Sequence, residues 1–294
     1  MINLGGGLSI LVPFNCKDEN HARFKNWTWL RKHWECVLPR AEIIIGKDRL
    51  SEEDPCIPFS KSSAINDAAS RATGDIYVIL DADGFINYWA ILLCAYRIRK
   101  ARKKDHKLWF VPYRQFYRLT ERASHKLIDS KPCFPYKFPC PPDLCDIQNT
   151  SGSQHGHWYG AGIQILPSEA FWCVGGWDER FRGWGGEDHG AMRATDTLYW
   201  PHKTLPGQFL HVWHPMLRPT ETGLNNDSWV DWKERVWENQ TSAGNNIALS
   251  GRYYGATGHV KRMKKLVEEG KRFKKELDKE KEPWYRRVIN LFRG

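Results

Sequence analysis

The sequence predicts an α/β protein with a mostly parallel sheet covered by helices. Three observations carry this prediction. Short apolar runs alternate with segments of helical periodicity through the first part of the chain, two aspartates follow the third apolar run, and 294 residues suffice for one large domain with an appendage.

The first apolar runs define a βαβ unit. LSILVPF at residues 8–14 is a continuous apolar strand, and aromatic and aliphatic residues then recur at helical spacing over residues 24–34. AEIIIG at residues 41–46 is the second strand. A strand, a helix and another strand in this order predict two parallel strands of one sheet.

A second helix and a third strand bring carboxylates to this sheet. The helical stripe over residues 65–72 stops at Gly74, a residue type that commonly follows a helix end. The strand DIYVIL comes next and delivers Asp81 and Asp83 to its carboxyl end. Open α/β sheets bind their ligands at that end of the strands.

The later predicted helices and strands are separated by a long loop. We expect a helix at residues 88–103, one or two strands at 107–119, and strands at 160–168 and 208–215 with a short helix between them. Residues 131–157 are rich in proline, glycine and polar residues. A loop of this length in a compact domain is usually functional or disordered.

The net charge of +10 is unevenly distributed, because residues 261–281 supply much of the basic excess. A basic balance suits nucleic acid, an anionic membrane surface or a phosphate-bearing substrate, and charge alone does not choose among them. For residues 261–281 a solvent-exposed helix face is the favoured interpretation.

No segment of the chain reads as a membrane span. The longest apolar run, WAILLCAYRI, is broken by Arg97 and Arg99 and is shorter than the ~20 residues that cross a bilayer. The first residues lack the basic region and cleavage pattern of a signal peptide. We therefore expect a soluble, cytoplasmic protein.

The eight cysteines fall into two groups. Five are scattered through regular segments, as reduced core thiols are: Cys16, Cys36, Cys56, Cys94 and Cys173. Cys133, Cys140 and Cys145 cluster in the long loop. Neither a fourth ligand nor a CxxC-like pair accompanies them, which disfavours a zinc site.

Asp81 and Asp83 can converge on one hard cation, which in turn neutralises the phosphates of a nucleotide donor. The alternative is that the two aspartates only cap a loop. His211 and His214 lie downstream in FLHVWHP, and their addition to the carboxylates shifts the expected metal toward Mn²⁺, with Mg²⁺ as the alternative.

A second acidic pair follows the glycine-rich run GWGG. A helix that begins at Glu187 places Glu187 and Asp188 in its first turn, where the helix dipole and free N–H groups favour the ionised carboxylates. One can hold an acceptor hydroxyl while the other removes its proton. The alternative is that the pair only caps the helix.

These motifs resemble a known family. GWDERFRGWGGEDHG, preceded by YGAGIQILPSEAFWCVGG, is similar to the acceptor-side motif of glycosyltransferases with the GT-A fold, above all the β-1,4-galactosyltransferase group and the polypeptide N-acetylgalactosaminyltransferases. The first strand, the helix and strand that end in DAD, and HVWH occur in the family's order. The resemblance covers residues 8–215 and implies a Rossmann-like, mixed but mostly parallel sheet flanked by helices.

The resemblance also implies roles for single residues. Asp83, His211 and His214 would bind the metal, and Asp81 would contact the metal or the donor ribose. The donor site would comprise Pro13, Phe14, Asn15, Asp48, Lys61, Asp81 and Trp184, with Trp184 in a mobile loop. The acceptor site would comprise Trp158, Tyr159, Gly160 and Glu187, and Asp188 would be the catalytic base.

Two details of the motif bear on the reaction. Retaining relatives carry Glu-Asn where this chain has Glu187 and Asp188, so an inverting reaction is favoured. The galactosyltransferase group usually continues with further aspartates, whereas His189 and Gly190 follow here. The motif therefore leaves the donor sugar and the acceptor open.

We thus expect a metal-dependent, inverting glycosyltransferase that moves a sugar from a nucleoside-diphosphate donor, with UDP favoured, to a hydroxyl of a glycan, protein or lipid-linked acceptor. Residues 1–215 would form the catalytic domain, divided into a nucleotide-sugar half (1–105) and an acceptor half (106–215). Residues 216–294 would form a helical, basic extension with possible peripheral membrane contact.

Three alternatives accompany this expectation. A retaining enzyme of the same fold is one. A nucleotidyltransferase also uses paired aspartates, but the chain has no early glycine-rich phosphate loop. A noncatalytic carbohydrate- or nucleic-acid-binding module would account for the 15 tryptophans and the basic tail, but not for the acidic pair or the two histidines, and no nucleic-acid partner is expected.

Overall fold

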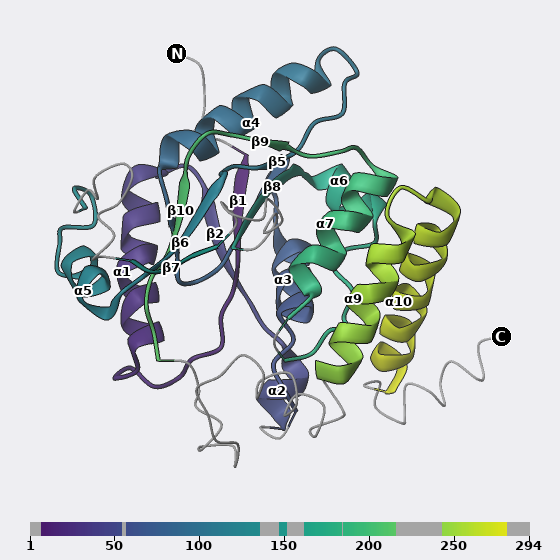
Figure 1. Ribbon diagram of the computed structural model, residues 1–294, viewed down its shortest axis with the longest axis horizontal. Helices are drawn as coiled ribbons and strands as arrows, with labels where there is room; N and C mark the ends of the chain where they lie inside the picture. Colours follow the sequence, from purple (N-terminus) through teal and green to yellow (C-terminus); the bar gives the residue numbers. More distant parts are fainter. Residues whose placement is uncertain are drawn as a thin grey trace.

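The computed structural model describes residues 7–54, 57–135, 147–151, 162–183, 185–215 and 243–280 (Figure 1). The first half holds β1 (Leu8–Pro13), α1 (Ala22–Val37), β2 (Glu42–Gly46), α2 (Arg49–Glu53), α3 (Lys61–Arg71), β3 (Ile76–Leu80), β4 (Gly84–Ile86), α4 (Tyr88–Arg102), β5 (Phe110–Val111), β6 (Gln115–Leu119) and α5 (Glu121–Ile128). The second half holds β7 (Ile147–Ser151), β8 (Ile163–Pro167), α6 (Ser168–Cys173), α7 (Glu187–Leu198), β9 (Lys203–Thr204), β10 (Gln208–His211), α9 (Ala243–Ala256) and α10 (Val260–Glu280).

The strands form two sheets. The six-stranded sheet has the order β2-β1-β3-β8-β5-β9, and β1 pairs in parallel with both β2 and β3. β8 runs antiparallel to β3 and β5. The smaller sheet, β4-β10-β6-β7, was not predicted, because its strands are short and come from distant parts of the chain. The expected mixed α/β fold with a mostly parallel sheet is confirmed.

The apolar pattern explains the central strands. Every residue of β1 and β3 is buried, as expected for parallel strands covered by helices on both faces. Helix α1 supplies Trp27, Leu30 and Trp34 to the same core. These are three of the residues whose spacing predicted a helix.

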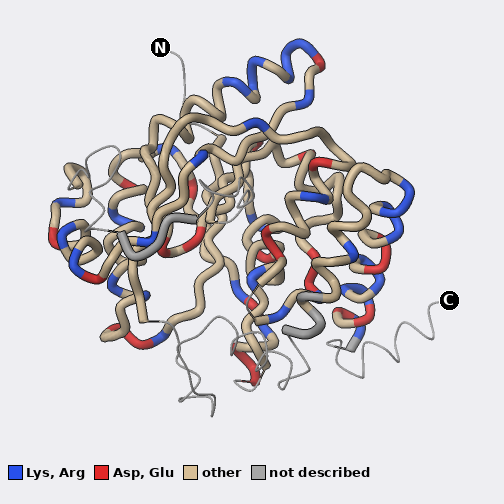
Figure 2. The backbone as a smooth tube through the Cα atoms, in the orientation of Figure 1, with Lys and Arg blue, Asp and Glu red and all other residues tan. Residues whose placement is uncertain are grey.

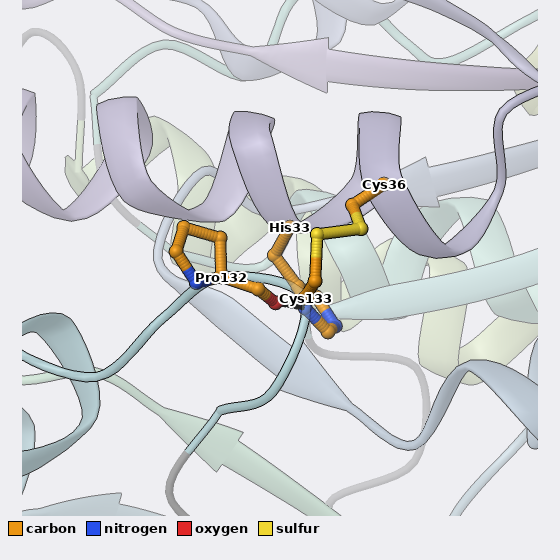
Figure 3. Close-up of a disulfide and its surroundings, with 4 residues drawn as sticks. All are labelled: His33, Cys36, Pro132 and Cys133. Carbon is orange, nitrogen blue, oxygen red and sulfur yellow. Dashed lines mark hydrogen bonds between the residues drawn. A yellow bond between two sulfur atoms is a disulfide. The ribbon is translucent and has the colours of Figure 1, made fainter.

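A disulfide joins Cys36 on α1 to Cys133, which are 97 residues apart in sequence (Figure 3). Beside it, His33 Nδ1 lies 2.6 Å from the carbonyl oxygen of Pro132. The expectation that Cys36 is a reduced core thiol is therefore wrong, and Cys133 is its disulfide partner. Cys140 and Cys145 lie outside the described residues. Disulfides persist mainly in oxidising compartments, so the bond argues against the expected cytoplasmic location.

The C-terminal helices pack onto the rest of the protein. Met263, Leu266 and Val267 of α10 are buried in a second apolar cluster together with Tyr253 of α9 and Phe181. Lysines and arginines line the outer side of α10 at the right of Figure 2. Thus α10 has the exposed basic face that was expected, but its other face forms a core that the sequence analysis missed.

No helix among the described residues is long and apolar enough to cross a membrane. The tryptophan-bearing stretch at residues 228–239 lies outside the described part of the chain. The domain boundary at residue 215 remains a prediction.

Candidate functional site

The parallel strands end at one edge of the sheet and bring the predicted donor residues there. Pro13 ends β1 opposite Gly46, the last residue of β2, and Asp81 follows the last residue of β3. Pro13 is buried, Phe14 is half-buried and Asn15 is exposed. The backbone N–H of Asp81 donates to the carbonyl of Gly162 over 2.9 Å, so the chain enters β8 beside the aspartates.

Three predicted ligands form what we call the metal group: Asp83, His211 and His214. β4 pairs antiparallel with β10 so that Gly84 lies opposite His211, and the N–H of Val212 donates to the carbonyl of Asp83 over 2.8 Å. One ligand atom from each of the three residues lies within 4.8 Å of the others. Nε2 of His214 is 3.2 Å and Nε2 of His211 is 3.6 Å from a carboxylate oxygen of Asp83.

The charge states of the metal group fit a divalent cation. Burial lowers the pKa of His211 to about 4, which leaves a neutral imidazole at neutral pH. Burial alone would raise the pKa of Asp83, but its interactions with His211, the hydrogen bond from His214 and the nearby Arg23 together hold it well below its usual range. Oδ1 of Asp83 is buried without a hydrogen-bond partner among the described residues. Two imidazoles and a carboxylate are a ligand set that can hold a divalent metal ion.

A second set of residues, the lysine cluster, consists of Lys61, Asp81, Glu187 and Asp188. Ser60 caps α3 by accepting a hydrogen bond from the N–H of Ser63, and Lys61 follows it. Nζ of Lys61 lies 2.7 Å from an oxygen of Asp81, 2.7 Å from one of Asp188 and 3.7 Å from one of Glu187. Thus Asp81 contacts Lys61, and its predicted contact with the metal or the donor ribose remains a prediction.

Burial and charge set the protonation of the lysine cluster. Burial would lower the pKa of Lys61, but the carboxylates of Asp188, Asp81 and Glu187 raise it well above its usual range, so the ammonium stays charged. Burial, with the charges of Glu187 and Asp81, raises the pKa of Asp188, and Lys61 opposes this. An aspartate with a raised pKa is a stronger base than an exposed one.

Several polar residues at this edge were missed by the sequence analysis. Arg23 Nη2 lies 3.7 Å from Asp83. Arg118 is half-buried; its burial lowers its pKa, and the charges of Asp83 and Asp81 oppose this. The side chain of Gln164 donates to the carbonyl of Asp188 over 3.3 Å. No local pattern marked any of the three residues as functional, although Gln164 lies in the stretch YGAGIQILPSEAFWCVGG.

The other predicted site residues have different surroundings. Asp48 is 1% exposed, and its Oδ2 accepts hydrogen bonds from the N–H of Ser60 and from Arg182. This anchors the segment before α3, and contact between Asp48 and a base remains a prediction. Trp184, Trp158, Tyr159 and Gly160 lie outside the described residues, so their predicted roles stay predictions.

Comparison with known proteins bears on this site. Residues 144–194, which include the acidic pair, match the family described as the N-terminal domain of galactosyltransferase. This segment is similar to the galactosyltransferases. The expected relation to GT-A glycosyltransferases, and with it the enzyme class, is confirmed. No curated protein matches the sequence of this glycosyltransferase significantly.

Solved structures resemble this glycosyltransferase distantly. Drosophila β-1,4-galactosyltransferase 7 with xylobiose is 16% identical over 76% of this chain and 81% of that chain, with a TM-score of 0.38. GalNAc-T7 with UDP, GalNAc and Mn²⁺ is 14% identical over 72% and 38%, with a TM-score of 0.40. The mannosyltransferase PcManGT from Pyrobaculum calidifontis, with GDP-Man and Mn²⁺, is 13% identical over 90% and 73%, with a TM-score of 0.43.

Proposed function

We propose that this glycosyltransferase is metal-dependent and inverting, and that it moves a sugar from a UDP-sugar to a hydroxyl of a glycan, protein or lipid-linked acceptor. The observation that carries the proposal is the contact between Lys61 and both Asp81 and Asp188. One lysine joins the carboxyl end of β3, where a donor would bind, to a buried carboxylate that can act as a base.

The basic residues at the sheet edge support an anionic donor. Arg23 lies 3.7 Å from Asp83 and Lys61 contacts Asp81, while the charges of both aspartates act on Arg118. Cationic side chains placed where charge develops on a departing diphosphate stabilise the transition state. Asp83, His211 and His214 would hold a divalent cation there, and such a cation, when bound, supplies further positive charge for the diphosphate.

Asp188 is the proposed general base. Its carboxylate lies in the first turn of α7, next to Glu187, whose Oε2 is buried without a hydrogen-bond partner among the described residues. An acceptor hydroxyl that binds to Glu187 would lie near Asp188 and transfer its proton there as the hydroxyl oxygen attacks the anomeric carbon. A diphosphate that attracts Lys61 would weaken the contact between Lys61 and Asp188 and leave that oxygen available.

A donor screen tests the proposal. Release of the nucleoside diphosphate is measured with UDP-galactose, UDP-glucose, UDP-N-acetylgalactosamine and GDP-mannose, each with Mn²⁺, Mg²⁺ or EDTA. We expect turnover of a UDP-sugar with Mn²⁺ and none in EDTA. Full activity in EDTA would exclude a metal-dependent reaction, and absence of turnover with every donor would favour a noncatalytic carbohydrate-binding protein.

The stereochemistry separates the two reaction types. NMR of the first product formed from an α-linked donor should show a β-glycoside if the reaction is inverting. An α-glycoside would identify the retaining alternative. Sedimentation with anionic vesicles, for the full chain and for a Lys264→Glu/Lys265→Glu variant of the exposed α10 face, tests peripheral membrane contact separately.

A further inference from the structure

The turn that precedes the acidic pair has internal contacts in its first part, between Asp178 and Arg180, whereas its last part is rich in glycine. We call residues 178–183, 185 and 186 the α7 turn. Gly183, Gly185 and Gly186 all have φ between 70° and 103°, in the left-handed region where glycine is favoured. Gly186 is the N-cap of α7 and provides no side-chain hydrogen bond to it. Because glycine is the most flexible residue in the unfolded chain, contacts from elsewhere must hold this turn.

Helix α9 supplies such contacts. The Asn246 side chain, 1% exposed, pairs with both backbone groups of Arg182: the N–H of Arg182 donates to its Oδ1 over 3.2 Å, and its Nδ2 donates to the Arg182 carbonyl over 2.7 Å. The Tyr253 hydroxyl donates to Asp178 over 3.0 Å. At Gly186 an added Cβ would lie 3.0 Å from Cβ of Ser250, so α9 directly abuts the start of α7.

Helix α10 holds the first part of the α7 turn. Arg180 pairs with Glu269 over 3.2 Å and donates to the carbonyl of Leu266 over 3.0 Å. Lys274 pairs with Glu179, which is 3% exposed. Glu179 in turn accepts a hydrogen bond from Asn66 of α3 over 2.9 Å.

These contacts connect the C-terminal helices to the lysine cluster from two directions. Through the α7 turn they reach Glu187 and Asp188, and through Glu179 and Asn66 they reach α3, the helix that begins with Lys61. On the other side, Ser60 donates to the carbonyl of Phe181, and the N–H of Gly183 donates to the carbonyl of Phe59. The turn therefore lies between the segment before α3 and the α9–α10 pair.

We propose that α9 and α10 position the acidic pair for catalysis, with Asn246 as the main positioning residue. This inference rests on the proposed function of Asp188. Asn246 does not touch the reacting groups; it fixes the backbone of Arg182, six residues before Asp188, through a donor and an acceptor at once. Displacement of a catalytic group by about 1 Å can lower a rate about 100-fold, so loss of this pairing affects turnover more than donor binding.

Two full-length variants test the inference. Asn246→Ala removes both hydrogen bonds to Arg182, and Tyr253→Phe removes only the hydroxyl that binds Asp178. The matched control is Trp29→Phe on α1, on the opposite side of the molecule (Figure 1). It removes a part-buried hydrogen bond of 2.8 Å from Trp29 to the carbonyl of Ser130, which follows α5. For each protein we measure kcat and KM for UDP-galactose with Mn²⁺, the melting temperature, and hydrogen exchange of peptides over residues 178–198.

We expect kcat to fall about 10-fold or more for Asn246→Ala and about 3-fold for Tyr253→Phe, with KM changed less than 2-fold. Trp29→Phe should lower the melting temperature but leave kcat per folded molecule unchanged. Exchange should rise in the 178–198 peptides of Asn246→Ala and not in those of Trp29→Phe. If Asn246→Ala does not fold, the same comparison is made with Tyr253→Phe.

An unchanged kcat together with unchanged exchange overturns the inference, as does a fall in kcat no larger than that of the control. If the wild-type protein turns over no sugar nucleotide, the proposed function fails, and so does the catalytic role of α9 and α10. The exchange data then still show whether Asn246 holds the turn. The two failures are therefore distinguishable.

Discussion

The metal group and the lysine cluster lie at the same edge of the sheet but balance their charges differently. The metal group combines one ionised carboxylate with two imidazoles, and His211 is neutral at neutral pH. The lysine cluster places three carboxylates around one buried ammonium. The metal group can accept a cation from solution, whereas the lysine cluster already contains the ammonium of Lys61.

This difference assigns separate tasks to the two groups in the proposed reaction: donor binding to the metal group and proton removal to the lysine cluster. A group completed by an external cation suits the binding of an anionic donor. A group with an internal cation and surplus negative charge suits a base, because burial and the charges of Glu187 and Asp81 raise the pKa of Asp188. Substitutions that alter one group and leave the other intact test whether the division holds.

The largest effect is expected for Asp83→Asn, which keeps the size of the side chain but removes the negative charge of the metal group. Transfer should fall about 1,000-fold, since a bound metal contributes several kcal/mol to transition-state stabilisation. Calorimetric titration should show loss of Mn²⁺ binding. Asp75→Asn is the control, because Asp75 pairs with Arg99 and Arg102 instead. Wild-type Mn²⁺ affinity in Asp83→Asn would exclude this residue as a ligand.

Lys61→Met should be the most destabilising change in the lysine cluster. It leaves Asp81, Glu187 and Asp188 without their shared cation, and loss of one partner of a buried pair costs about 3–5 kcal/mol. Chemical denaturation measures this loss. Lys271→Met is the control, because it removes an exposed pair with Glu268 and should have little effect. Equal stability of the two variants would mean that Lys61 does not balance the carboxylates.

Asp188→Asn should lower turnover ~100-fold while donor affinity stays nearly constant. The pKa of Asp188 is raised, so in the wild type the rate should fall on acidification at a higher pH than for an ordinary aspartate. The residual rate of Asp188→Asn should not show this fall at acidic pH. Asp196→Asn, on the same helix, is the control, since Asp196 pairs with His202. A rate near that of wild type would transfer the role of base to another residue, with Glu187 tested next.

The smallest effect on activity is expected for Cys36→Ser/Cys133→Ser. Opening a disulfide that spans 97 residues should reduce the free energy of unfolding by about 2–4 kcal/mol. The bond lies outside both charged groups, so turnover per folded molecule should persist. Denaturation with and without reductant, alongside activity, measures this, with Cys16→Ser as the control. A large loss of turnover in the folded variant would link the disulfide to the site.

Local patterns predicted part of the fold and of the site. The buried strands β1 and β3 and the helix at Glu187 follow from apolar runs and a glycine-rich start, which depend only on neighbouring residues. Residues 216–294 were expected to be helical, but α9 was not located within them, and its sequence combines several glycines with little charge. Apolar contacts with Phe181 and α10 stabilise α9, and these contacts cannot be inferred from the sequence of α9 alone.

The sequence by itself determined which chemical groups this protein has. It predicted the ends of the central strands, the three ligands of the metal group and the acidic pair, because each lies within a short motif next to a regular element. Only the tertiary structure decided how these groups combine. Lys61 contacts Asp188 across 127 positions of sequence, Cys36 bonds to Cys133, and α10 turns its apolar face to the α7 turn. Such pairings depend on how sheet and helices pack, and local periodicity carries no information about partners so far apart.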